Sequence, residues 1–322
     1  MLGYIVKEFG GPEVMLWEKL PDPQPGPGQV LVRVHASGIN FAETRMRAGT
    51  YAGIPLPFIM GMEGAGIVEA LGEGVSGFSP GERVFGRARG CHAERVLFDA
   101  AHLMPMPEGL DFNQAAAIPV GWLTAWHALH TVAKIQPGDK ILIEAVGGSV
   151  GSAALQIAKQ AGCWVAATAS RDDKLEPARA AGADLLINYK NHSVSEAVLK
   201  ATGDQGVDVS LMTIGEATAQ QLLDSMGMDG KVVMFGSTGG RDITFNLNIG
   251  IRNLQLLSMS ISTSPAFEPV TMPDFIQRAL PLFASGVFKP EVDTVLPLQQ
   301  LVNAHQMIDD RRHYGKVIMQ VT

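Results

Sequence analysis

The segment "ILIEAVGGSVGSAALQIAK" at residues 141–159 constrains the fold of this chain more than any other. A β-branched apolar run at 140–146 leads into glycines at 147–148 and Gly151, and an Ala-rich amphipathic pattern follows. This order predicts a parallel strand, a tight turn and a helix that begins near Val150. The first turn of a helix offers unpaired N–H groups and a positive dipole end, which together bind phosphate. We therefore expect a nucleotide at this turn.

The glycine pattern is an incomplete match to the G-x-G-x-x-G dinucleotide fingerprint, because Val146 occupies the first glycine position. Gly148 would let the backbone approach a pyrophosphate, and Gly151 would let the helix pack closely on the strand. A glycine-rich connector without any ligand is the alternative. The segment lies within about five strand–helix alternations over 121–257, and this context favours a cofactor site in a parallel, doubly wound sheet.

Three parts of the chain differ in pattern. Residues 1–120 contain short strand-like runs broken by turn-rich segments, which predicts an irregular, mainly β domain. Residues 121–257 predict the α/β domain, and residues 258–322 contain two helix-like segments and a last strand, "KVIMQV". With 322 residues the chain is longer than one ordinary core supports, so two domains are expected. The helices of the α/β domain are expected to end at glycines: Gly162, Gly182, Gly203 and Gly227.

Composition narrows the class of partner. Hydrophobic residues make up 46% and charged residues 18% of the chain, which speaks against disorder. A net charge of −7 and a pI near 5.6 argue against nucleic acid and anionic membranes, so a small-molecule partner is expected. No secretory signal pattern and no apolar run of about 18 residues is found. With only two cysteines, a soluble protein in the reducing cytoplasm is expected.

The end of the second strand of the α/β domain indicates which dinucleotide binds. The segment "TASRDDK" offers Ser170, Arg171 and Lys174, all of which can donate to a ribose 2′-phosphate. An NAD site would instead place an acid there to accept from the 2′-hydroxyl. Asp172 and Asp173 are interpreted as helix N-terminal capping and dipole-pairing residues. NADPH is therefore the predicted cofactor.

Several longer motifs occur in a fixed order along the chain. They are "GINFAETRMRAGTY", "MGMEGAGIVEALGEGVSGFSPGERV", "AIPVGWLTAWHAL", "AVGGSVGSAALQIAK", "GADLLINY" and the closing "LPLQQLVNAHQMIDDRRHYGKVIMQV". In these motifs the chain resembles the zinc-independent quinone oxidoreductase branch of the medium-chain dehydrogenase/reductase superfamily. The resemblance implies an α/β protein: a GroES-like, mainly β catalytic domain at 1–120, completed by 258–322, around a doubly wound Rossmann NADPH-binding domain at 121–257.

The resemblance also makes missing metal ligands informative. Asn40 and Met62 stand where the zinc-dependent branch has a cysteine and a histidine, so no catalytic zinc is expected. The adjacent Cys91 and His92 are interpreted as ordinary packing or surface residues. His127 and His130 lack a third ligand in the sequence and are interpreted as structural.

The family's cofactor contacts, carried over residue by residue, imply the following site in this chain: Asn40, Thr124, Gly148, Ser149, Val150, Ser170, Arg171, Lys174, Tyr189, Thr213, Phe235, Gly236, Ser237, Thr238 and Lys316. Asn40 and Thr124 would lie near the nicotinamide, and Asn40 is also a candidate catalytic residue. Tyr189 would lie by the adenosine phosphate or be a plain aromatic at a strand end. Trp122 and Trp126 are assigned to the core in preference to a substrate platform.

Without a metal, the acceptor must itself spread the incoming negative charge, as quinones and conjugated enones do. The expected function is NADPH-dependent reduction of such an acceptor. An enoyl-thioester reductase or a non-catalytic nucleotide-binding protein are the alternatives, and a zinc-type alcohol dehydrogenase is nearly excluded. Tyr51 either donates a proton, as in related enoyl reductases, or only lines the pocket. The apolar run at 253–261 suits a sheet edge paired across a two-fold axis, so a homodimer is expected.

Overall fold

The computed structural model describes residues 1–51, 53–240, 242–244 and 251–321. The chain divides into two compact units, one formed by Met1–Val120 with Ile276–Thr322 and the other by Gly121–Phe275. Each unit is described by itself. In the described part of the chain, no helix is both long and apolar enough to cross a bilayer.

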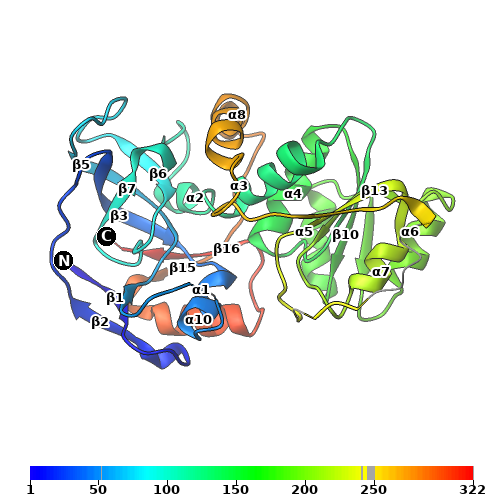
Figure 1. The fold of residues 1–322 in the computed structure, drawn as a ribbon, viewed down its shortest axis with the longest axis horizontal. Helices are drawn as coiled ribbons and strands as arrows, with labels where there is room; N and C mark the ends of the chain where they lie inside the picture. The colour runs from blue at the N-terminus through cyan, green and yellow to red at the C-terminus, as the bar shows by residue number, and fades with distance from the viewer. Residues whose placement is uncertain (52, 241, 245–250, 322) are drawn as a thin grey trace. The chain divides into compact units, whose positions relative to one another are not determined.

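The first unit is mainly β (Figure 1). A three-stranded sheet has the order β2-β1-β4, and a larger sheet has the order β15-β16-β3-β5-β6-β8, with β7 paired to β3. The strands are β1 (Leu2–Val6), β2 (Met15–Lys19), β3 (Gln29–Gly38), β4 (Phe58–Ile59), β5 (Glu63–Leu71), β6 (Arg83–Arg87), β7 (Arg95–Asp99), β8 (Leu103–Pro105), β15 (Val292–Pro297) and β16 (Lys316–Gln320).

Short helices complete this first unit, and the last of them ties the C-terminal part to the N-terminal part. They are η1 (Pro12–Val14), α1 (Phe41–Arg47), η2 (Ala100–His102), α2 (Phe112–Ala116), α9 (Leu280–Ala284), η7 (Leu298–Gln300) and α10 (Leu301–Asp309). Helix α10 packs against α1 and η1 (Figure 1). Its buried Leu301, Ala304 and Ile308 share one apolar cluster with Tyr4 and Val6 of β1.

The second unit is a parallel sheet covered by helices on both faces (Figure 1). The six strands have the order β11-β10-β9-β12-β13-β14, and all described pairs are parallel. This is the doubly wound order, in which the chain reverses direction between β9 and β12. The strands are β9 (Lys140–Ile143), β10 (Trp164–Ala169), β11 (Leu185–Asn188), β12 (Val207–Met212), β13 (Met226–Met234) and β14 (Gln255–Ser258).

The helices of the second unit follow the alternation expected from the sequence. They are α3 (Gly121–Trp126), η3 (His127–Ala133), α4 (Ser149–Gln160), η4 (Asp172–Lys174), α5 (Leu175–Ala180), α6 (Val194–Thr202), α7 (Ala219–Asp224), η6 (Phe267–Thr271) and the start of α8 (Met272–Arg278). Helices α6 and α7 contact each other and share one face of the sheet. The predicted fold class, a GroES-like β domain with a Rossmann domain, is confirmed.

The second unit extends beyond the predicted end at residue 257. Trp126 Nε1 donates to Asp274 Oδ2 over 2.8 Å, and His127 Nδ1 lies 2.6 Å from Thr271 Oγ1. These bonds attach η6 and the start of α8 to α3 and η3. The unit therefore ends at Phe275, because long-range side-chain bonds fix it there and no local pattern marks that residue.

Two local expectations differ from the structure. Strand β9 ends at Ile143, not at Val146, because Ala145 adopts a left-handed backbone with φ of 51°. The prediction that a helix ends at Gly227 is wrong, since α7 already ends at Asp224 and Gly227 lies inside β13. The other three predicted helix-ending glycines do have positive φ: Gly162, Gly182 and Gly203.

Candidate cofactor site and buried polar network

In the second unit, the residues predicted to hold the cofactor follow the carboxyl ends of five neighbouring parallel strands. Gly148–Val150 follow β9, Ser170 follows β10, Tyr189 follows β11, Thr213 follows β12 and Phe235–Thr238 follow β13. Carboxyl ends of parallel strands meet at one edge of the sheet, and ligands of open α/β sheets bind there. The structure therefore brings these residues to one edge.

The glycine turn after β9 meets the spatial needs of a phosphate site. A Cβ atom added to Gly151 would lie 2.5 Å from the Ala145 carbonyl oxygen, so only glycine lets α4 pack this closely on the strand. At Gly148 the nearest atom to an added Cβ is that same carbonyl oxygen, at 3.4 Å, which is ordinary contact. Gly148 is the N-cap of α4, a helix of 12 residues whose first N–H groups point toward this open side.

Glu144, a buried carboxylate that the sequence analysis did not single out, holds the loop after β12. It accepts hydrogen bonds from the backbone N–H groups of Thr213 and Ile214, at 2.8 and 2.9 Å, and from the Thr218 hydroxyl. Burial raises the pKa of Glu144, and these three donors oppose that shift. A second bond joins this loop to the segment that follows β13: the Thr238 backbone N–H donates to the Thr213 carbonyl oxygen at 3.0 Å. This bond holds Thr213 and Thr238 together.

The segment after β10 presents both cations and acids. Arg171 pairs with Asp173, its Nε lying 2.9 Å from Asp173 Oδ1, and Asp172 Oδ1 accepts from Asn188 Nδ2 at 2.8 Å. The capping interpretation of the two aspartates is therefore wrong, since the N-cap of η4 is Arg171 and no side-chain cap bond is present. Both aspartates do lie in the first turn of η4, where the dipole-pairing interpretation put them. Asp173 engages Arg171, and Ser170 and Lys174 stay predicted phosphate contacts.

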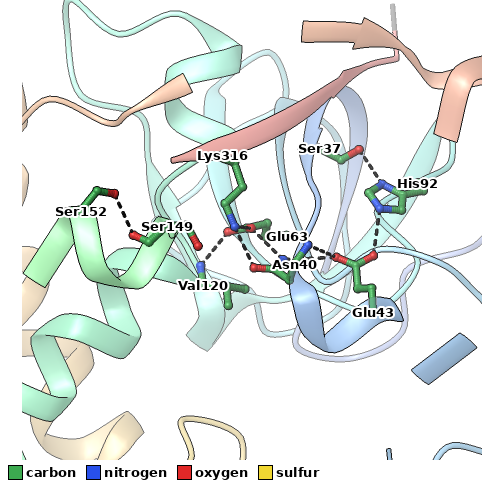
Figure 2. A network of polar contacts seen from close by, with 9 residues as sticks. All are labelled: Ser37, Asn40, Glu43, Glu63, His92, Val120, Ser149, Ser152 and Lys316. Atoms are coloured by element: carbon green, nitrogen blue, oxygen red, sulfur yellow. Dashed lines mark hydrogen bonds and ion pairs between the residues drawn. The ribbon is translucent and has the colours of Figure 1, made fainter. Parts of the chain in front are cut away.

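In the first unit, Asn40 and Lys316 meet in a buried network although 276 positions separate them in sequence (Figure 2). Lys316 Nζ donates to Asn40 Oδ1 at 2.7 Å and to Glu63 Oε1 at 2.6 Å, and Lys316 and Glu63 are 1% and 0% exposed. Asn40 Nδ2 also donates to Glu63 Oε1 at 2.8 Å. The other oxygen of Glu63 accepts from the Val120 backbone N–H at 2.6 Å. Every charged atom of this trio has an oppositely charged or polar partner.

The network continues to a histidine whose partners the sequence analysis did not foresee. Glu43 Oε1 accepts from the Asn40 backbone N–H at 3.0 Å, which closes a capping box at the start of α1. Glu43 Oε2 lies 2.9 Å from His92 Nε2, and His92 Nδ1 lies 2.8 Å from Ser37 Oγ (Figure 2). His92 is thus a fully buried polar residue and not a surface or ordinary packing residue.

Electrostatics in this part of the first unit reflect the burial. Burial alone would raise the pKa of Glu43, but His92 and neighbouring donors hold that pKa below its usual value. His305, on α10, is buried, and desolvation lowers its pKa to about 3. Burial also raises the pKa of the Cys91 thiol well above its usual value, so that this cysteine stays protonated. Glu43 is therefore ionised and His305 neutral at physiological pH.

Known proteins match the chain over both units. Residues 26–108 match the model of the alcohol dehydrogenase GroES-like domain, and residues 149–282 match the model of the zinc-binding dehydrogenase family. Rat quinone oxidoreductase is 33% identical over 319 residues, covering 98% of this chain and 96% of the relative. The chain belongs to the quinone oxidoreductases of the medium-chain dehydrogenase/reductase superfamily.

Two further proteins are similar to the chain along their whole length. A 2-haloacrylate reductase of a Burkholderia species is 30% identical, covering 99% of this chain and 98% of the relative. The crystal structure of Escherichia coli quinone oxidoreductase complexed with NADPH superimposes with a TM-score of 0.92 at 29% identity, covering all of both chains.

Asn40 is one of the two residues that the sequence analysis compared with zinc ligands. Its amide oxygen accepts a hydrogen bond from the Lys316 ammonium at 2.7 Å. Lys316 is buried, and two of the three N–H donors of its ammonium are engaged by Asn40 and Glu63, so it orients Asn40. The cofactor contact that the resemblance implies for Lys316 stays a prediction.

The remaining aromatic and histidine assignments agree with core packing. Trp122 and Trp126 are 2% and 0% exposed, and Trp126 stacks obliquely on His130 with ring centroids 4.2 Å apart. His127 is hydrogen-bonded to Thr271.

Tyr51 follows α1 and is half-buried, with its backbone N–H donating to the Arg45 carbonyl oxygen at 3.1 Å.

Proposed function

We propose that this protein is an NADPH-dependent oxidoreductase that transfers hydride to a quinone or another conjugated carbonyl compound. The observation that supports this most is the row of predicted cofactor residues at the ends of β9 to β13, in a chain that is similar over its whole length to quinone oxidoreductases. When bound, NADPH supplies the hydride chemistry. The residues of the chain bind the dinucleotide, orient the acceptor and exclude water.

Each part of NADPH has candidate contacts among the described residues. The first turn of α4, from Ser149, with Gly148 before it, suits the pyrophosphate, and Ser170 and Lys174 suit the 2′-phosphate. Thr213 and Phe235–Thr238, held by Glu144 and by the Thr238–Thr213 bond, would lie along the nucleotide. Thr124 and Asn40 are the candidates at the nicotinamide, and Tyr189 is the candidate at the adenosine end.

We expect Lys174→Ala to raise the KM for NADPH by roughly 10- to 100-fold and to leave the KM for NADH nearly unchanged, because a charge-assisted bond to a phosphate is worth about 1.5–3 kcal/mol. Initial-rate kinetics with both cofactors measure this, and Lys200→Ala on α6 is the matched control. Equal losses with NADPH and NADH would contradict the assignment of Lys174.

The reaction is proposed to need no catalytic metal. Asn40 and Met62 replace two zinc ligands, and Lys316 places a positive charge beside Asn40. With no Lewis acid at the carbonyl, the acceptor itself must spread the charge that hydride adds, which favours quinones and conjugated enones over simple ketones. Hydrogen bonds from Lys316 and to Glu63 would then hold the Asn40 side-chain amide in one orientation.

Enoyl-thioester reduction is the second candidate function, and a substitution of Tyr51 distinguishes it from quinone reduction. Tyr51 is half-buried, and its side chain makes no described hydrogen bond, so we propose that its hydroxyl is available to a substrate. We expect Tyr51→Phe to keep quinone turnover within several-fold, because hydroquinone oxygens take protons from water. Enoyl reduction should fall at least tenfold, since general-acid help is worth roughly 10²- to 10⁴-fold.

Steady-state rates of the Tyr51→Phe variant with a quinone and an enoyl thioester measure this split. A variant that binds NADPH normally and yet loses quinone turnover would contradict it. A wild-type protein that binds NADPH and turns over no acceptor would favour the non-catalytic alternative.

A homodimer is also proposed. Strand β14 is the last strand of its sheet, with β13 on one side and no described strand on the other. An unpaired strand edge is a template for pairing with a second copy across a two-fold axis. Light scattering at micromolar concentration is expected to give twice the chain mass of 34.3 kDa, and a monomer mass would refute the proposal.

A further inference from the structure

Glu43, His92 and His305 form a closed cluster in the first unit, here called the Glu–His cluster. They come from three separate segments: helix α1, the loop between β6 and β7, and helix α10. All three side chains are fully buried. One carboxylate oxygen and one nitrogen of each imidazole lie within 4.8 Å of one another. The cluster lies outside the set of residues assigned to the cofactor.

The polar atoms that face one another in the cluster have few partners among the described residues. Both nitrogens of His305 lack a hydrogen-bond partner anywhere in the described ranges of the chain. Glu43 Oε2 and His92 Nε2 lie 2.9 Å apart, and neither atom has another polar partner among the described residues. Buried polar atoms without partners are costly and rare, so this concentration of them calls for an additional binding partner.

The other polar atoms of Glu43 and His92 are held in place. Ser37 Oγ fixes His92 Nδ1 at 2.8 Å (Figure 2). The Asn40 backbone N–H and Nδ2 both donate to Glu43 Oε1, at 3.0 and 3.2 Å. In protein metal sites, hydrogen bonds of this kind orient the ligand side chains from behind. They leave His92 Nε2 and Glu43 Oε2 as the two atoms available for coordination.

We propose that the Glu–His cluster binds one divalent transition-metal ion, with zinc favoured, through Glu43 Oε2, His92 Nε2 and one nitrogen of His305. Two imidazoles and one carboxylate are a common ligand set for zinc, and the fourth position of a tetrahedral site is open to water. Ligand atoms around such an ion sit about 3.4 Å apart, given bonds of about 2.1 Å. Glu43 Oε2 and His92 Nε2, now 2.9 Å apart, would move slightly apart to this spacing, and the His305 nitrogen lies within 4.8 Å of both.

The ion would have a structural role. It would cross-link α1 and the β6–β7 loop to α10, which joins the N-terminal and C-terminal parts of the first unit. Arg47 is a buried cation that acts electrostatically on His305, and it is paired with Asp309 over 2.9 Å. The competing arrangement is a plain buried ion pair between Glu43 and a protonated His92, with His305 left unsatisfied.

Metal content of the folded full-length protein tests the proposal. The chain is produced in zinc-supplemented medium, desalted, and its bound zinc is measured by mass spectrometry. About one zinc per chain is expected, and His305→Gln should weaken zinc binding at least 100-fold. His192→Gln, which removes an exposed histidine far along the sequence on the second unit, is the matched control and should keep the zinc. Cobalt substituted for zinc in the wild type should give visible absorption bands typical of tetrahedral nitrogen and oxygen ligation.

Three results would overturn the proposal. A folded wild-type chain that holds well under one zinc would indicate the ion pair alone. Zinc binding that is equal in wild type and His305→Gln would assign the ion to other residues. The wild-type cobalt spectrum decides independently of whether His305→Gln folds: a spectrum of octahedral aqueous cobalt contradicts a built site.

Discussion

Replacing Lys316 by methionine is expected to lower the free energy of unfolding by about 3–5 kcal/mol, because it leaves the buried Glu63 carboxylate without its cation. Methionine keeps most of the volume of the lysine side chain, so the loss reports the charge and not a cavity. Urea denaturation followed by circular dichroism measures the effect. Lys200→Met, on the exposed face of α6, is the matched control and should change stability by less than about 0.5 kcal/mol.

The double variant Lys316→Met with Glu63→Gln distinguishes a loss of stability caused by the unpaired Glu63 charge from a loss caused by other effects of the Lys316 substitution. Glutamine removes the unpaired charge, and its amide oxygen still accepts from Asn40 or Val120. A substantial part of the lost stability should return. If the double variant is as unstable as Lys316→Met alone, the ion pair is not what Lys316 contributes, and the account of the buried network is wrong.

Two glycine substitutions in the turn after β9 should separate stability from cofactor binding. Gly151→Ala places a Cβ 2.5 Å from the Ala145 carbonyl oxygen and 2.7 Å from Val146 Cα, both backbone atoms that cannot move aside cheaply. We expect a loss of about 1–3 kcal/mol in stability together with weaker NADPH binding. Gly148→Ala meets only an ordinary contact at 3.4 Å and needs no positive φ, since φ is −87°.

Gly148→Ala should therefore keep the stability of the fold and still raise the Kd for NADPH at least tenfold, because its methyl group occupies space that the pyrophosphate needs. Thermal melts and fluorescence titration with NADPH measure the two effects. Unchanged NADPH affinity in Gly148→Ala would show that the phosphates do not approach this turn.

The fold was predictable because its signals are local and repeated. The run of apolar strands, amphipathic helices and terminal glycines at Gly162, Gly182 and Gly203 fixes the α/β unit, and the ordered motifs supply the topology. The predicted end at residue 257 differs from Phe275, because the bonds of Trp126 to Asp274 and of His127 to Thr271 join segments about 145 residues apart and leave no local trace.

The candidate site was predictable at positions where the course of the backbone itself limits which residue types fit. Gly148 and Gly151 are such positions, as are the residues that follow strand ends. The buried network was not predictable, since Asn40, Glu63 and Lys316 meet only when β16 pairs with β3. His92 was interpreted as ordinary for the same reason: its partners Ser37 and Glu43 lie about 50 residues earlier. Glu144 gave a signal that could have been used, because an acid at the end of an otherwise apolar buried strand needs donors.

The most direct test of the proposed function is the rate of NADPH oxidation by the purified protein with matched acceptors. The set comprises a benzoquinone, a conjugated enone, an enoyl thioester, and a saturated ketone of similar size to the enone. The account predicts turnover with the quinone or the enone, a preference for NADPH over NADH, and no turnover with the saturated ketone. Turnover of the saturated ketone at the rate of the enone, or no oxidation of NADPH by any conjugated acceptor, would contradict it.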